Sequence, residues 1–87
     1  MISKKVTVSN QQGFHMRPAN MFVSAMAPFK SEVSIIYNGN TINGKSPMFI
    51  IAACIRCGSE IEIKCNGEDE EEALSVAVDL VESGFGE

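Results

Sequence analysis

The chain has few of the residues on which large enzymes and nucleic-acid-binding proteins depend. Its 87 residues include no tryptophan, one tyrosine and one histidine, and seven lysines and arginines face eleven aspartates and glutamates. The net charge of −4 argues against a nucleic-acid ligand, because nucleic acid selects basic surfaces. A chain of this length predicts one domain, residues 1–87, with a modest core and no deep substrate pocket. A surface site that works by docking suits this size better.

The sequence also has no segment that predicts membrane insertion or export. No apolar stretch approaches the roughly 18 residues that a spanning helix needs. The opening residues, Met1-Ile2-Ser3-Lys4-Lys5, lack the apolar region of a signal peptide. We therefore expect a soluble protein that works in the cytoplasm.

Cysteine usage predicts neither a disulfide framework nor a metal centre. Three cysteines are an odd number, and we expect no export signal in this chain. Cys54 and Cys57 form a C-x-x-C, but zinc would need two further ligands, and only Cys65 and His15 remain. We predict that this pair is buried and inert. Glycine-rich nucleotide loops are absent, so we expect no cofactor and no metal.

The only histidine lies in the stretch Gly13-Phe14-His15-Met16-Arg17-Pro18-Ala19. Proline is typical of the first turn of a helix, where its missing amide would have had no partner. The spacing predicts a helix from about Met16 to Ala27, ending before Pro28. His15 is then the N-cap residue, next to unpaired backbone amides. The buried face of this helix is expected to consist of Ala19, Phe22, Val23 and Met26.

This position predicts phosphoryl chemistry at His15. The positive end of a helix disfavours imidazolium, so we expect a neutral, nucleophilic imidazole near pH 7. A phosphoryl group on the ring would meet the backbone amides of Met16 and Arg17, and the Arg17 guanidinium could add a charge-assisted bond. The simpler alternative is that His15 is an ordinary cap or surface residue, since lone histidines are common.

A second helix is predicted to begin at Ser46-Pro47, because serine is a favoured N-cap and proline suits the next position. The eight residues that follow, Met48 to Ile55, are all apolar. A surface helix cannot bury its whole circumference, so some of these side chains should face water and mark a docking site. A wholly internal strand is the alternative, because periodicity alone does not separate the two.

The remaining elements alternate as short strands and one last helix. Strands are expected near residues 5–9, 32–37, 40–42 and 60–65, with an Asn38-Gly39 hairpin turn. Asp69 is expected to cap a final helix with Glu72 as its box partner, and Gly84 to end it. The order β-α-β-β-α-β-α predicts an α+β fold, an open-faced sandwich with the helices on one face of an antiparallel sheet. The pattern alone leaves a ferredoxin-like arrangement open. The predicted inward residues are Ile61, Ile63 and Cys65 on the last strand, and Leu74, Ala77, Val78 and Val81 on the last helix.

The stretch from Gly13 to Ala19 resembles the active-site signature of HPr, the histidine-containing phosphocarrier family of the sugar phosphotransferase system (PTS). The resemblance extends over the whole chain and implies a four-stranded sheet in the order 1-4-2-3 with three helices on one face. Other segments similar to the family are Tyr37-Asn38-Gly39, Asn43 to Met48, Gly58 and Ser83-Gly84-Phe85-Gly86-Glu87.

The resemblance also implies a function. His15 would take a phosphoryl group on its pros nitrogen from phospho-enzyme I, originally from phosphoenolpyruvate, and pass it to enzyme IIA domains. Arg17 would stabilise the phosphate. The chain would be a carrier rather than an enzyme, with its partners supplying the catalysis. The candidate docking residues around His15 are Asn20, Met21, Met48, Phe49 and Ile51.

A second site is implied at Ser46, which matches the serine that HPr kinase/phosphorylase phosphorylates in the family. The chain departs from the family at Met16, Pro47 and Phe49, where smaller or different residues are usual. Two hypotheses follow: a phosphocarrier acting through His15, or a regulatory module controlled at Ser46 that docks a transcription factor or metabolic enzyme. Acid separates them, because phosphohistidine is hydrolysed in acid and phosphoserine survives.

Overall fold

The computed structural model describes residues 1–86 of the chain, so Glu87, the last residue of the HPr-like ending, lies outside the described residues. Within residues 1–86, no helix combines the length and apolar character needed to cross a bilayer. The elements, in chain order, are β1 (Ile2–Thr7), α1 (Met16–Met26), β2 (Glu32–Tyr37), β3 (Asn40–Asn43), α2 (Pro47–Ala52), β4 (Glu60–Asn66), α3 (Glu70–Glu82) and a 3-10 turn (Gly84–Gly86).

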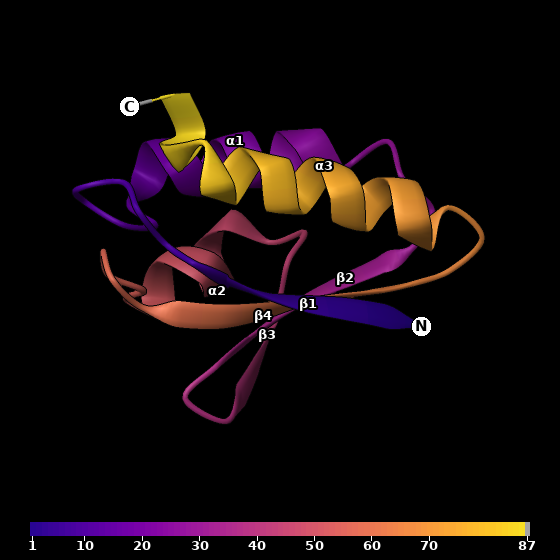
Figure 1. Ribbon diagram of the computed structural model, residues 1–87, viewed down its shortest axis with the longest axis horizontal. Helices are drawn as coiled ribbons and strands as arrows, with labels where there is room; N and C mark the ends of the chain where they lie inside the picture. The colour runs from indigo at the N-terminus through magenta and orange to yellow at the C-terminus, as the bar shows by residue number, and fades with distance from the viewer. Residues whose placement is uncertain (87) are drawn as a thin grey trace.

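The four strands form one antiparallel sheet in the order β1-β4-β2-β3, and the helices cover one of its faces (Figure 1). The register places Val6 opposite Ile61 and Ile35 opposite both Ile63 and Ile42, so the apolar residues share one side. This order confirms the open-faced sandwich and replaces the ferredoxin-like alternative.

The core lies between the sheet and the long helices α1 and α3. The inward residues predicted for β4 are all buried, whereas Glu60 is exposed. Val23 and Leu74 are half-buried at the edge of the predicted helix stripes. The predicted residues that are buried are Ala19, Phe22 and Met26 on α1, Ile61, Ile63 and Cys65 on β4, and Ala77, Val78 and Val81 on α3.

Turn chemistry follows the sequence at two positions. Asn38 and Gly39 have φ angles of 51° and 79°, as a type I′ hairpin between β2 and β3 requires. Gly84 follows α3 with a φ of 68°, the left-handed conformation in which helices commonly end. Both predicted turns are therefore confirmed.

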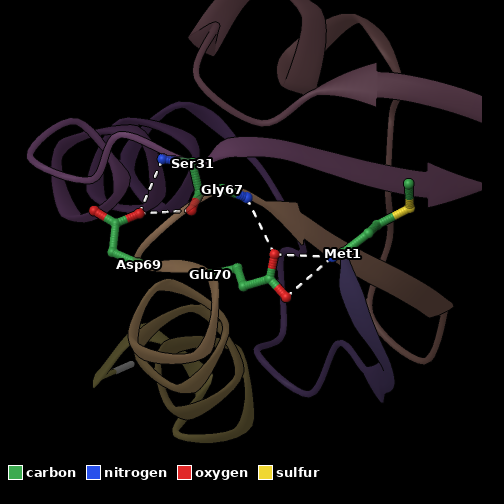
Figure 2. Close-up of polar contacts among 5 residues, drawn as sticks. All are labelled: Met1, Ser31, Gly67, Asp69 and Glu70. Atoms are coloured by element: carbon green, nitrogen blue, oxygen red, sulfur yellow. Dashed lines mark hydrogen bonds and ion pairs between the residues drawn. The ribbon is translucent and has the colours of Figure 1, made fainter.

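The prediction that the Asp69 side chain caps the last helix is wrong. Asp69 precedes α3, but its carboxylate makes no capping hydrogen bond. Its two oxygens accept instead from the amide of Lys30 at 2.8 Å and from the amide and hydroxyl of Ser31 at 2.9 and 2.5 Å. Figure 2 shows the two bonds from Ser31. Three donors from the loop after α1 outcompete the local amides, so Asp69 ties that loop to the start of α3. Glu70 accepts from the Gly67 amide at 3.1 Å.

Candidate functional site

His15 is the N-cap residue of α1, as predicted. Its backbone is extended, with φ −78° and ψ −171°, and its carbonyl accepts the first helical hydrogen bond from the Ala19 amide at 3.0 Å. The imidazole makes no capping bond and is half-buried. The ring therefore lies at the surface beside the positive end of the helix, where the first-turn amides have no helical partner.

A rigid turn delivers the chain to His15. The Gly13 amide donates to the Asn10 carbonyl at 3.1 Å, and the buried Asn10 side-chain amide donates to the Gly13 carbonyl at 2.6 Å. The next amide, that of Phe14, donates to the Ile55 carbonyl at 3.0 Å. These three bonds hold the backbone of the turn that leads to His15.

Phe14, the residue before His15, is held in the core. Its ring is 2% exposed and makes edge-on contacts with Phe22 of α1, at a centroid distance of 5.7 Å, and with Phe85, at 5.1 Å. Such aromatic pairs add stability beyond the area they bury. The residue before His15 is thus part of the core, while His15 itself faces outward.

A polar hollow opens in front of the imidazole. Its volume is about 530 Å³, and its lining combines His15 and Arg17 with the turn that precedes them. Arg17 is exposed in the first turn of α1. The predicted pair of His15 and Arg17 is therefore brought together on one polar surface. The full lining is Ser9, Asn10, Gln11, Gln12, His15 and Arg17.

Sequence reasoning missed the contribution of Gln11 and Gln12. Both are exposed and occupy the two central positions of the turn closed by Asn10 and Gly13, which turns them toward the hollow. The available signal was the Asn-x-x-Gly spacing, which is typical of a turn with a left-handed residue at its end.

A second, apolar groove runs from His15 along α1. Asn20 and Met21, two of the predicted docking residues, line it together with Met16. Leu80 of α3 forms its far side. The polar hollow and the apolar groove share His15 and Arg17, so the imidazole lies where the two meet. The groove is lined by His15, Met16, Arg17, Asn20, Met21, Ser24, Ala25 and Leu80.

The second predicted helix is confirmed as α2, and the internal strand is wrong. Ser46 is its N-cap, and the Ser46 hydroxyl accepts from the Phe49 amide at 3.5 Å. Only Ile50 of this helix is buried, whereas Met48, Phe49 and Ile51 are 80%, 62% and 37% exposed. Helix α2 packs against α1. Phe49 also lines a separate hollow of about 480 Å³ between α2 and the β2–β3 hairpin.

The prediction for the C-x-x-C pair is wrong. Cys54 and Cys57 are both exposed, and only Cys65 is buried. Helix α2 ends before Cys54, which adopts a left-handed φ of 55°, and the following loop buries only Ile55. The chain therefore returns to the surface after Ile55, which leaves Cys57 exposed. Burial raises the pKa of the Cys65 thiol, and the carboxylates of Glu70 and Asp69 raise it further.

The fold and the site together define a small α+β protein that presents one histidine at a helix N-terminus on its surface. A family model described as "PTS HPr component phosphorylation site" matches residues 2–83. The chain therefore belongs to the HPr family of the PTS, and phosphocarrier function in that system is the function its relatives support.

Curated relatives match over the full chain. The phosphocarrier protein HPr of Treponema pallidum is 38% identical over 87 residues, covering 100% of this chain and 99% of the relative. The phosphocarrier protein HPr of Neisseria meningitidis serogroup A is 36% identical, covering 100% and 98%. Among solved structures, HPr from Thermoanaerobacter tengcongensis superposes with a TM-score of 0.96 at 36% identity, covering 100% of this chain and 98% of that chain.

Proposed function

We propose that this chain works in the cytoplasm as a phosphocarrier whose reacting group is His15. It takes a phosphoryl group from phospho-enzyme I, charged by phosphoenolpyruvate, and passes it to enzyme IIA domains. The observation that carries the proposal is the N-cap imidazole at the rim of a polar hollow that also contains Arg17. The partners provide the catalytic machinery, so the chain itself is a carrier and not an enzyme.

The transfer needs little from this chain besides position and charge. The pros nitrogen of His15 attacks phosphorus, the new N–P bond forms, and the bond between phosphorus and the donor atom breaks. Phosphoryl transfer depends mainly on positioning and on stabilising the phosphate oxygens. The amides of Met16 and Arg17 at the start of α1 and the Arg17 guanidinium supply that stabilisation.

Incubation with phosphoenolpyruvate and enzyme I tests the proposal. We expect wild type to acquire one acid-labile phosphoryl group and His15→Ala to acquire none. Arg17→Ala should still be labelled, but about tenfold more slowly, because one charge-assisted contact is lost. Equal labelling of wild type and His15→Ala would contradict the proposal. Acid-stable labelling alone would favour the regulatory module instead.

The partner is proposed to dock over the apolar surface beside His15. Met48, Phe49 and Ile51 of α2 are exposed, as is Asn20, and Met21 is half-buried in the groove that reaches the imidazole. Exposed apolar surface of this kind usually marks an interaction site. Phe49→Ala should raise the KM of enzyme I for this chain about tenfold. Val76→Ala is the matched control, because Val76 is 36% exposed on α3 and belongs neither to the exposed residues of α2 nor to the groove beside His15.

Ser46 is proposed as a regulatory phosphorylation site for HPr kinase/phosphorylase, with a transcription factor as one reader of the phosphorylated form. A phosphate on an N-cap residue faces the first amides of its helix, so the fold should tolerate it. Its charge next to the apolar surface of α2 would weaken docking. Ser46→Asp should therefore raise the KM of enzyme I for this chain, whereas Ser46→Ala should not. Failure of the kinase to form an acid-stable phosphoserine would contradict this part of the proposal.

A further inference from the structure

Two methionines at the proposed docking surface and the adjoining groove are largely exposed. Met16, directly after His15, is 68% exposed, and Met48 of α2 is 80% exposed. Another methionine, Met26, is completely buried in the core. Met21 is half-buried and packs against the core. The chain therefore divides its internal methionines between positions open to small oxidants and positions protected from them.

We propose that Met16 and Met48 are an oxidation-sensitive modification site that controls docking at His15, with a peroxide as the oxidant. The inference rests on the proposed function, because it concerns the surface through which His15 meets its partners. Oxidation of the two thioethers switches the surface off, and methionine sulfoxide reductase switches it on again.

The chemical step balances with one peroxide per methionine. A lone pair of the thioether sulfur attacks an oxygen of hydrogen peroxide, the S–O bond forms, and the O–O bond breaks. The sulfur is oxidised by two electrons and the peroxide is reduced. The proton on the sulfur-bound oxygen passes to the departing hydroxide, which leaves as water. The exposed fractions of Met16 and Met48 provide access for this reaction, and the burial of Met26 prevents it.

The consequence follows from the location of each sulfur. Met16 lines the apolar groove that also contains His15, so its sulfoxide would place a polar oxygen in that groove. Met48 lies on α2, which packs against α1. A sulfoxide replaces apolar contact with a polar, partly negative oxygen that must be desolvated when a partner docks. Neither side chain belongs to the buried core, so the folded state is retained.

The test compares wild type with the Met16→Leu/Met48→Leu double variant, which keeps apolar side chains but lacks both sulfurs. Each protein is treated with hydrogen peroxide and then with dithiothreitol, because Cys54 and Cys57 are also exposed and their reversible oxidation must be removed. Peptide mass spectrometry locates the sulfoxides. The readout is the KM of enzyme I for the chain after peroxide, divided by its KM for the same chain before peroxide. The starting value of each variant therefore cancels.

We expect sulfoxide at Met16 and Met48 before Met21 and Met26. The KM of wild type should rise about tenfold, as for loss of an interface hot spot, and the ratio for the double variant should stay near one. Methionine sulfoxide reductase should return wild type to its starting KM, and circular dichroism should show the same fold throughout. An unchanged KM with both sulfoxides present, or an equal rise in the double variant, would overturn the inference. Absence of labelling before peroxide would overturn the proposed function itself, and with it the inference.

Discussion

Among the described glycines, Gly13 is the one at which an added Cβ would make the closest contact. Its φ of 65° is unfavourable for other residues, and an added Cβ would overlap the Ile55 carbonyl oxygen and lie 2.8 Å from the Arg56 Cα. Both neighbours are backbone atoms that cannot rotate away. Gly13→Ala should therefore lower the free energy of unfolding by about 3 kcal/mol and slow phosphorylation of His15, because the turn before it must move.

Gly39 provides the matched control for this substitution. Its φ of 79° is similar, but an added Cβ would meet nothing within 4 Å. Gly39→Ala should cost only the backbone term, about 1 kcal/mol, with no effect on His15. Urea unfolding of the two variants separates steric overlap from backbone strain. Equal losses of stability would show that contact with the Ile55–Arg56 backbone is unimportant.

The three cysteines should differ in reactivity because they differ in burial. Cys54 and Cys57 are exposed, whereas Cys65 is buried on β4 and its pKa is raised by burial first and by nearby carboxylates second. A disulfide reagent that forms a coloured thiolate should titrate two thiols in the native protein and the third only in denaturant. Cys65→Ser should leave the native count at two. A native count of three would contradict the burial of Cys65.

At the scale of elements, the link between α3 and the loop after α1 depends on ionised Asp69. The hydroxyl of Ser31 and the amide of Lys30 lower the pKa of Asp69 to about 2. A lowered pKa means that protons bind more readily to the unfolded chain, so the carboxylate stabilises the fold above about pH 4. This contribution is lost as the pH falls through about 2.

Asp69→Asn should therefore lower the melting temperature at pH 7, since an amide nitrogen cannot accept from the donors that the lost oxygen served. The difference from wild type should shrink between about pH 4 and pH 2, where wild type loses the same interaction. Glu71→Gln is the control, because Glu71 is exposed in the first turn of α3. Thermal melts that keep a constant difference from wild type across this pH range would argue against the assigned role of the carboxylate.

The elements were predictable where local sequence determines them. The N-cap position of His15, the start of α2 at Ser46-Pro47 and the Asn38-Gly39 turn depend on a few neighbouring residues, and each prediction is confirmed. The partners of Asp69 lie 38 and 39 residues away, and the exposure of Cys57 depends on where a loop leaves the core. Local patterns contain neither fact. The strand order came from the family resemblance and not from the pattern.

For the whole molecule, charge is divided between the two parts of the chain. Residues 1–59 contain six lysines and arginines and one glutamate, whereas residues 60–87 contain one lysine and ten acidic residues. Half of these acids form the run Glu68–Glu72, before and at the start of α3. Glu70 binds the ammonium of Met1 at 2.8 Å, at one end of β1, and the loop that carries His15 continues from the other end. Figure 1 shows the loops before α1 and α3 at opposite sides of the molecule.

This division predicts how phosphoryl transfer responds to salt. Helices α1 and α2 contain no acidic residue, and Arg17 and Arg56 lie near the turn that carries His15. A phosphorylated donor site is anionic, so the field favours approach with His15 facing it. Raising NaCl from about 0.05 M to about 0.5 M screens this field and should lower kcat/KM about threefold while kcat changes little. Arg56→Gln should weaken the salt dependence more than Glu71→Gln, which removes a charge at the opposite end. A kcat/KM that rises with salt would mean that the acidic run, and not the His15 end, dominates the encounter.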